Sequence, residues 1–457
     1  MAVIPHDRGS PGGSPDRGAE ESGEPPAGWT RLAAASVAVG VCTGLLVAGF
    51  RRLLEETEVW RTTVLALLGT HGALGLLSAM LGVAVAAALA AHLVRRYSPS
   101  AGGSGIPQVE AVLAGAQPLP PPAILPVKFF GGWLAIGSGL ALGREGPSVQ
   151  MGASLGGLWG RWCRLHRSDA IAVIAAGGGA GLATAFNAPI AGAVLVLEEL
   201  VRRYDPRVAV AALGASGGAI AVARVFLGQA PDFDVPPIPF SGVNGGLGFL
   251  MLGLCCGMLA TAYHRILLAA LDLADRLQGL PVELRAGLVG AGVGAVGWWA
   301  PGWIGGGDPL TQAALGSGLA LTGLPLLLGL RFLLSMVSYG AGTPGGLFAP
   351  MLTLGALTGL LVGTGLRWLH PDLQTPMSAY ALVGMAALFA GVVRAPVTAL
   401  VLVTELTGNT TLLLPMLAAG FVALLTTGWT GTPAIYDALS QRLAGLDRPV
   451  KPASEAP

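Results

Sequence analysis

The segment Gly143-Arg-Glu-Gly-Pro-Ser-Val-Gln-Met-Gly-Ala-Ser-Leu-Gly156 has a counterpart 203 residues later, Gly346-Leu-Phe-Ala-Pro-Met-Leu-Thr-Leu-Gly-Ala-Leu-Thr-Gly359. Pro147, Gly152, Ala153 and Gly156 of the first segment match Pro350, Gly355, Ala356 and Gly359 of the second, and the segments also share their first glycine. A second pair follows in the same order, Ala188-Pro-Ile-Ala-Gly-Ala-Val-Leu-Val-Leu-Glu198 and Ala395-Pro-Val-Thr-Ala-Leu-Val-Leu-Val-Thr-Glu405, at an offset of 207. Two ordered matches with little slack between them indicate an internal duplication.

The duplication sets the expected organisation of the chain. The polar stretch Gly228-Gln-Ala-Pro-Asp-Phe-Asp-Val-Pro-Pro-Ile-Pro239 separates the halves. We expect a first repeat over 29–228, a loop over 229–246 and a second repeat over 247–445. Residues 1–28 are rich in Gly, Pro, Ser, Asp and Glu and predict a disordered tail without a signal-peptide core. Residues 446–457 predict a second, short tail.

Composition places both repeats in a membrane. Of the 457 residues, 53% are hydrophobic and only 11% are charged, and mean hydropathy is +0.67. Soluble domains have about a quarter of their residues charged, so this chain cannot cover itself with a water-soluble surface. Apolar stretches long enough to cross a hydrocarbon core of about 30 Å recur, for example 32–50, 73–94, 247–262 and 380–406. The fold class is therefore an all-α polytopic membrane protein.

Other function classes find little support. A net charge of +1 argues against a nucleic-acid partner. The four cysteines and six histidines form no metal-ligand motif, so we expect no metal and no cofactor. The glycine runs at 177–179 and 305–307 lack the Lys-Ser/Thr of a phosphate loop, and no catalytic motif is present, so we expect no enzyme. A cation-coupled carrier would need carbonyl and carboxylate ligands at its site.

Glycine and proline at the head of each repeated motif point to an anion site. Proline suits the first turn of a helix, and the glycines before it leave backbone N–H groups uncovered. A helix that starts inside the membrane directs those N–H groups and its positive dipole end at a cavity, where an anion is the natural guest. Gly102-Gly-Ser-Gly-Ile-Pro107 and Asn187-Ala-Pro189 are two further such starts. The alternative is that these glycines only allow close helix packing.

Three glutamates are the strongest candidates for coupling an anion to protons. Charges at membrane depth are costly and usually functional. Glu145 stands at the head of the first repeated motif, where its carboxylate could compete with an anion for N–H groups and leave when protonated; the alternative is a simple ion pair with Arg144. Glu198 matches Glu405 in the second repeat, whereas Glu199 faces Leu406 and breaks the symmetry. Solvated pairs with Arg202 and Arg203 are the alternative for this pair.

These motifs resemble the CLC family of chloride channels and chloride/proton exchangers, over about residues 33–438. The resemblance rests on Gly103-Ser-Gly-Ile-Pro107, Gly143-Arg-Glu-Gly-Pro147, Gly346-Leu-Phe-Ala-Pro350, Phe186-Asn-Ala-Pro189 followed by Glu198-Glu199, and Ile435-Tyr436. It implies inverted repeats of broken and tilted helices whose N-termini meet at a mid-membrane chloride site. It also implies a homodimer with one ion pathway per subunit. The compact form, without CBS domains, fits a prokaryotic inner membrane with both termini cytoplasmic.

The resemblance also assigns roles to individual residues. Bound chloride would be held by the hydroxyls of Ser104 and Tyr436, the backbone N–H groups of Leu347 and Phe348, and a backbone contribution from Gly146. Glu145 would be the gate and external proton site. Glu199, with Glu198 beside it, would transfer protons on the internal side. Because channel members commonly carry an apolar residue in place of Glu199, its presence favours chloride/proton antiport over the alternative, a passive gated chloride channel.

Overall fold

The computed structural model of the chain describes residues 28–236, 238, 246–277, 279–316, 318–372 and 375–445. Within these ranges the fold is helical throughout, with two isolated β-bridges and no strand, which confirms the expected all-α class. The expected tails, residues 1–28 and 446–457, lie outside the described residues apart from Gly28. So do residues 237 and 239–245 of the expected inter-repeat loop.

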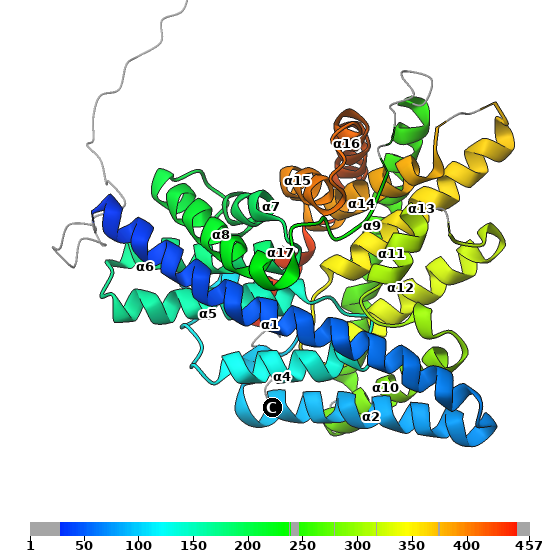
Figure 1. The fold of residues 1–457 in the computed structure, drawn as a ribbon, viewed down its shortest axis with the longest axis horizontal. Helices are drawn as coiled ribbons and strands as arrows, with labels where there is room; N and C mark the ends of the chain where they lie inside the picture. Colours follow the sequence, from blue (N-terminus) through cyan, green and yellow to red (C-terminus); the bar gives the residue numbers. More distant parts are fainter. Residues whose placement is uncertain are drawn as a thin grey trace, which may run out of the picture.

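Among the described residues, the first half of the chain forms eight α-helices, which Figure 1 draws in blue to green. They are α1 (Trp29–Gly69), α2 (Gly72–Tyr97), α3 (Ile106–Leu113), α4 (Ile124–Gly137), α5 (Glu145–Trp162), α6 (Arg167–Ala185), α7 (Pro189–Leu195) with its π-helical extension Val196–Leu200, and α8 (Pro206–Leu227).

The second half repeats this order and adds a final helix. Its helices are α9 (Gly246–Arg276), α10 (Val282–Trp299), α11 (Asp308–Leu315), α12 (Leu324–Gly340), α13 (Phe348–Leu369), α14 (Met377–Val393), α15 (Pro396–Thr407), α16 (Leu413–Trp429) and α17 (Ile435–Ala444). Short 3-10 turns at Pro99–Ala101, Pro301–Trp303 and Leu321–Gly323 precede α3, α11 and α12.

Packing repeats along with the order. In the first half α1 packs on α8 and α5 on α6, and in the second α9 packs on α16 and α13 on α14. Across the halves, α2 packs on α10 and α7 on α15, as in two repeats related by a pseudo-two-fold axis (Figure 1). The short helices α3 and α11 match in detail, because each follows a glycine with φ near +100°, Gly105 and Gly307, and has proline in its first turn.

Glycines set the closest helix contacts at matching places in the two halves. Gly152 of α5 and Gly177 of α6 lie against each other's carbonyl groups, and Gly355 of α13 and Gly384 of α14 do the same. A β-carbon at any of these four positions would clash with the opposite backbone. The repeated glycines of the sequence therefore pack helices, and this holds for Gly152 and Gly355 within the repeated motifs themselves.

Helix length and burial fit a membrane protein whose centre is made of broken helices. Six described helices, α1, α2, α6, α8, α9 and α13, are long and apolar enough to cross a bilayer. The apolar windows of α6 and α13 are 78% and 72% buried, whereas that of α2 is 28% buried. The exposed leucines of α2, such as Leu74 and Leu81, therefore face outward to lipid, and α6 and α13 form the interior.

The two ends of the spanning helix α8 lie at opposite faces of the molecule. Its 22 residues correspond to a length of about 33 Å, which matches the hydrocarbon core. The segment before its start carries Glu199 and Arg202. The segment after its end carries Asp232, which pairs with Arg144 and Arg51. Polar groups near Glu199 and near Asp232 therefore lie at opposite faces.

Candidate functional site: the meeting point of the broken helices

The loops that precede α3, α5 and α13 are joined by backbone hydrogen bonds. Gly143 N–H donates to the Gly346 carbonyl at 2.8 Å, and Gly346 N–H donates back to Gly143 at 2.6 Å. Gly103 N–H donates to Thr343, and Gly345 N–H donates to Gly103, both at 3.1 Å. The motifs singled out in the sequence thus form one cluster at the interface of the two halves.

Glu145 of the first half occupies the start of α13 in the second half. Its side chain is fully buried, and one carboxylate oxygen accepts hydrogen bonds from the N–H groups of Phe348, at 2.5 Å, and Ala349, at 3.3 Å. The other oxygen has no hydrogen-bond partner. Arg144 points elsewhere, to Asp232 and Asp308. The carboxylate therefore lies on the unpaired N–H groups and the positive dipole end of a helix, where an anion would bind.

Two hydroxyl groups face the same cluster. Ser104 Oγ and Tyr436 Oη are buried and lie close to each other, and neither makes a hydrogen bond of normal geometry with a described residue. The Tyr436 ring lies 5.8 Å from the ring of Phe348, between centroids. A β-carbon built on Gly146 would lie 2.5 Å from Ser104 Oγ, so the first turn of α5 also approaches Ser104 closely. Buried hydroxyls are costly when unpaired, and these two are free to donate to an anion.

The sequence reasoning located most of this cluster and missed part of it. The predicted residues Ser104, Glu145, Gly146, Phe348 and Tyr436 lie together. Leu347 is the residue just before α13, while Ala349, not foreseen, supplies the second N–H to Glu145. Its only sequence signal was its place in the first turn of the second repeated motif.

Two supporting side chains were also missed. The Lys128 ammonium is fully buried and donates to the carbonyls of Ala101 at 3.0 Å and Gly103 at 2.8 Å. The Tyr339 hydroxyl accepts from Ser104 N–H at 3.4 Å. Both hold the loop that presents Ser104. The sequence does show a lysine and a tyrosine inside apolar runs. Both could have been noticed, because a buried ammonium or hydroxyl group needs a hydrogen-bond partner.

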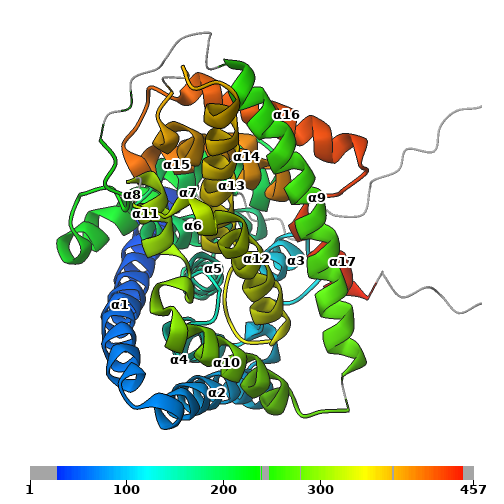
Figure 2. The ribbon, with the colours of Figure 1, turned by 90° about the vertical axis from the view of Figure 1, so that its right-hand side faces the viewer.

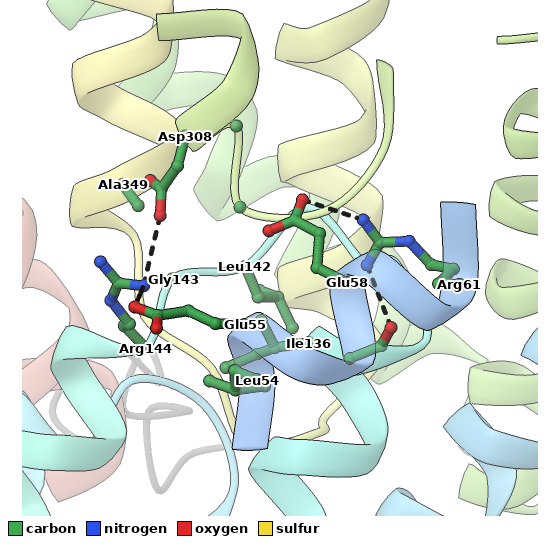
Figure 3. Close-up of a pocket in the computed structure, with 13 residues that line it drawn as sticks. Leu54, Glu55, Glu58, Arg61, Ile136, Leu142, Gly143, Arg144, Asp308 and Ala349 are labelled. Carbon is green, nitrogen blue, oxygen red and sulfur yellow. Dashed lines mark hydrogen bonds and ion pairs between the residues drawn. The ribbon is translucent and has the colours of Figure 1, made fainter. Parts of the chain in front are cut away.

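A small polar cavity leads outward from the cluster (Figure 3). Its wall includes Gly143 and Ala349, which adjoin Glu145, and its charged lining is Glu55, Glu58, Arg61, Arg144 and Asp308. Figure 3 shows Arg144 between Asp308 and Glu55, with Arg61 bound to Glu58 and to the Gly137 carbonyl. Glu145 itself does not line the cavity. Gly143 and Ala349, which do, lie between its carboxylate and the charged groups of this face.

Arg144 is held by four groups from different parts of the chain. Its guanidinium donates to the Ala185 carbonyl at 3.0 Å and to Asp232 at 3.1 Å, and lies 3.4 Å from Asp308 and 3.8 Å from Glu55. Because Arg144 immediately precedes Glu145, this network fixes the start of α5 and the backbone from which Glu145 projects.

A larger vestibule opens at the opposite face, beside Glu199. It has a volume of about 650 Å³. The Glu199 side chain is 4% exposed, and its carboxylate lies 3.2 Å from the Arg202 guanidinium, so this glutamate is nearly buried and pairs at i+3 spacing, unlike the solvated i+4 pairs of the alternative prediction. The vestibule is also lined by Glu110, Asp437 and Ser440, none of which the sequence reasoning placed in the site.

Glu198 points away from this vestibule. Its carboxylate accepts from the N–H groups of Val397 at 3.0 Å and Thr398 at 2.6 Å, at the start of α15. In the mirror arrangement Glu405 of α15 accepts from Ile190 and Ala191 at the start of α7, at 3.1 and 2.7 Å. The matched glutamates of the two repeats therefore cap each other's helices.

The donor set fits an anion better than a metal ion. Among the described residues no group of three or more His, Cys, Asp or Glu is placed to hold a metal. The central cluster offers hydroxyl and backbone N–H donors, which suit chloride.

Comparison with known proteins agrees with this architecture. The profile of the voltage gated chloride channel family matches residues 86–428. The chain is 33% identical over 410 residues to the H(+)/Cl(-) exchange transporter ClcA of Salmonella typhimurium and to that of Salmonella typhi, covering 88% of this chain and 87% of each relative.

Solved structures give the same result. A slow cyanobacterial Cl⁻/H⁺ antiporter superposes with a TM-score of 0.87 at 33% identity, covering 92% of this chain and 99% of that one. A CLC-type fluoride/proton antiporter superposes with a TM-score of 0.72 at 22% identity, which shows the shared fold, covering 89% of this chain and 97% of that one. Sequence profile, relatives and fold together show that the chain is an integral membrane protein of the voltage-gated chloride channel family, the CLC family, which is a family of ion transport proteins.

Proposed function

We propose that the protein exchanges chloride for protons across the membrane, with Glu145 as the gate and external proton site. The observation that carries the proposal is the position of the Glu145 carboxylate on the N–H groups of Phe348 and Ala349. A carboxylate and a chloride ion cannot share those donors. Protonation removes the charge that holds the side chain there, so chloride and proton binding become linked.

Chloride would then bind in contact with the donors around this point. The Phe348 N–H and the unpartnered hydroxyls of Ser104 and Tyr436 converge there, and Leu347 and Gly146 contribute backbone at the starts of α13 and α5. The relatives named as proton/chloride exchange transporters support chloride as the anion.

Glu199 would take up protons at the other face. It is nearly buried, it lines the vestibule, and it has no acidic counterpart in the second half. Glu198 was predicted to assist it, but its carboxylate is already bound to the start of α15, so we assign the proton step to Glu199. The vestibule would face the cytoplasm, and the protein would lie in a prokaryotic inner membrane as a homodimer.

Flux from vesicles containing the purified protein tests the proposal. Vesicles loaded with chloride and diluted into low chloride should take up protons against a pH gradient while chloride leaves. Chloride efflux without any uphill proton movement would leave the passive channel as the function. Absence of chloride flux in folded protein would contradict both functions.

Substitutions separate the two glutamate roles. Glu145→Ala should abolish proton uptake while chloride still flows, because the competitor for the N–H groups is gone. Glu199→Gln should also stop proton uptake with Glu145 unchanged. Glu56→Gln is the matched control, since Glu56 is an exposed glutamate of α1 paired with Arg52, and it should leave both fluxes unaltered. Uphill proton uptake by Glu145→Ala would refute its assignment as the gate.

A further inference from the structure

Arg202 joins three carboxylates from three different segments at the vestibule. Its guanidinium lies 3.2 Å from Glu199 and 3.5 Å from Glu110, and it forms a close ion pair with Asp437. It also donates to the Glu199 carbonyl at 3.0 Å. Glu199 is thereby faced by Glu110 from α3, Asp437 from α17 and Arg202 from the segment after the π-helix, and Arg203 lines the same vestibule.

The two helices that Arg202 reaches carry the hydroxyls of the central cluster. Ser104 lies two residues before the start of α3, and Tyr436 is the second residue of α17, next to Asp437. A further bond ties these helices together, since Ser440 of α17 donates to Glu110 of α3 at 2.9 Å. Arg202 and Glu110 therefore form one polar connection between Glu199 and both helices.

The backbone at Arg202 supports a role beyond general solvation. Its φ is +56°, in the left-handed region that non-glycine residues rarely adopt. Such a conformation persists where surrounding contacts determine it, and it occurs preferentially at functional sites. Here the contacts are the carbonyl and carboxylate of Glu199 together with Asp437.

We propose that Arg202 is a positioning residue that links the protonation state of Glu199 to the inner side of the chloride site through Asp437 and α17. The proposal rests on the chloride/proton exchange proposed above. Ionised Glu199 attracts the guanidinium and holds it between Glu199 and Asp437. Neutral Glu199 releases that attraction, so Arg202 shifts toward Asp437 and Glu110. The first turn of α17, and with it the Tyr436 hydroxyl, moves relative to Ser104.

The test compares two neighbouring arginines. Arg202→Gln removes the connection, and Arg203→Gln removes the same charge from the same vestibule. Each variant is reconstituted in vesicles, and the ratio of protons to chloride ions transported is measured over a range of internal pH. We expect Arg202→Gln to lower this ratio about threefold or more and to shift its dependence on internal pH while chloride flux persists; Arg202→Lys should restore part of the ratio. Arg203→Gln should match wild type.

Asp437→Asn is the second variant. It leaves Arg202 with Glu199 and Glu110 but weakens the connection to α17, so it should lower the ratio in the same direction. If Arg202→Gln does not yield folded protein, Asp437→Asn decides the question alone. A wild-type ratio and pH profile in Asp437→Asn, or in Arg202→Gln, would overturn the proposal, and so would equal losses of proton and chloride flux at an unchanged ratio. Wild-type protein that moves chloride without protons would refute the exchange function instead.

Discussion

At the scale of single residues, Asp232 has the most consequential ion pairs outside the central cluster. Its carboxylate lies 2.8 Å from Arg51 and 3.1 Å from Arg144, and its side chain is 6% exposed. Removing one partner of a buried ion pair leaves uncompensated charge and costs about 3–5 kcal/mol. We therefore expect Asp232→Asn to lower the thermal midpoint of the purified protein markedly and to slow chloride flux, because Arg144 sets the start of α5.

Asp308→Asn should have a smaller effect on the same measurements. Among the described residues Asp308 forms one ion pair, with Arg144 at 3.4 Å, and its side chain is 37% exposed, so solvent screens the pair. Asp272→Asn, which loosens the exposed pair with Arg442, is the control and should change neither midpoint nor flux. If Asp308→Asn lowers the thermal midpoint and the chloride flux more than Asp232→Asn does, the burial of each carboxylate does not determine how much its ion pairs contribute.

Single residues also show which parts of the candidate site could be predicted from the sequence. Glycine-proline motifs and an isolated acidic residue predicted an anion site at helix starts, and the family resemblance assigned Ser104, Glu145 and Phe348 to it. The sequence could not show that Glu145 crosses to the helix of the other repeat and lies on Ala349 N–H, since that depends on how the halves dock. Nor could it pair Arg202 with Asp437, which is distant along the chain and has no repeat partner.

At the scale of helices, the close approach of α13 and α14 depends on absent side chains. A β-carbon on Gly355 would lie 2.5 Å from the Gly384 carbonyl oxygen, so the helices would have to separate. Overpacking of this kind usually costs about 1–3 kcal/mol or more. Gly355→Ala should lower the thermal midpoint by several degrees or prevent assembly, measured by size-exclusion chromatography across a temperature series.

Gly365 on the same helix provides a matched control. It has open space around the position of a β-carbon, so Gly365→Ala should be neutral or stabilise by up to about 1 kcal/mol through helix propensity. If both substitutions destabilise equally, the loss comes from helix flexibility and not from contact with α14.

The reciprocal caps between α7 and α15 give a second prediction at this scale. Glu198 accepts three hydrogen bonds, two from backbone and one from the Thr398 hydroxyl, whereas Glu405 accepts two. Loss of a helix cap typically costs about 1 kcal/mol. Both Glu198→Gln and Glu405→Gln should lower the thermal midpoint, with Glu198→Gln the larger effect. A midpoint unchanged by both would mean that the caps are dispensable.

At the scale of the whole molecule, the order of the helices could be predicted from the duplication, but the face at which each helix begins or ends could not. Matched motifs at offsets of 203 and 207 foretold that α5 corresponds to α13 and α7 to α15. Arginines stand at both faces, however, so counting positive charges could not orient the chain. Contacts between distant segments are needed to assign faces.

Those contacts place the two described ends of the chain on one face. Trp29, at the start of α1, packs under the Arg207 guanidinium at 5.1 Å, and Arg207 lies in the first turn of α8 beside the vestibule. At the other end, Asp437 of α17 binds Arg202 at that same face, and α17 lies beside α3 (Figure 2). Arg51, about 33 Å farther along α1, reaches Asp232 at the opposite face.

If the vestibule faces the cytoplasm, as proposed, both termini lie there too. Green fluorescent protein fused to either end should fluoresce, and alkaline phosphatase fused to either end should be inactive.

Cysteine labelling tests the same orientation. In a background where Cys42, Cys163 and Cys255 are replaced by serine, a membrane-impermeant maleimide added outside should label Asp308→Cys and leave Arg203→Cys unlabelled until the membrane is opened. Outside labelling of Arg203→Cys would reverse the orientation. It would also reverse the sides from which Glu199 and Glu145 receive their protons, because α8 places Glu199 and Asp232, the ion-pair partner of Arg144 beside Glu145, at opposite faces.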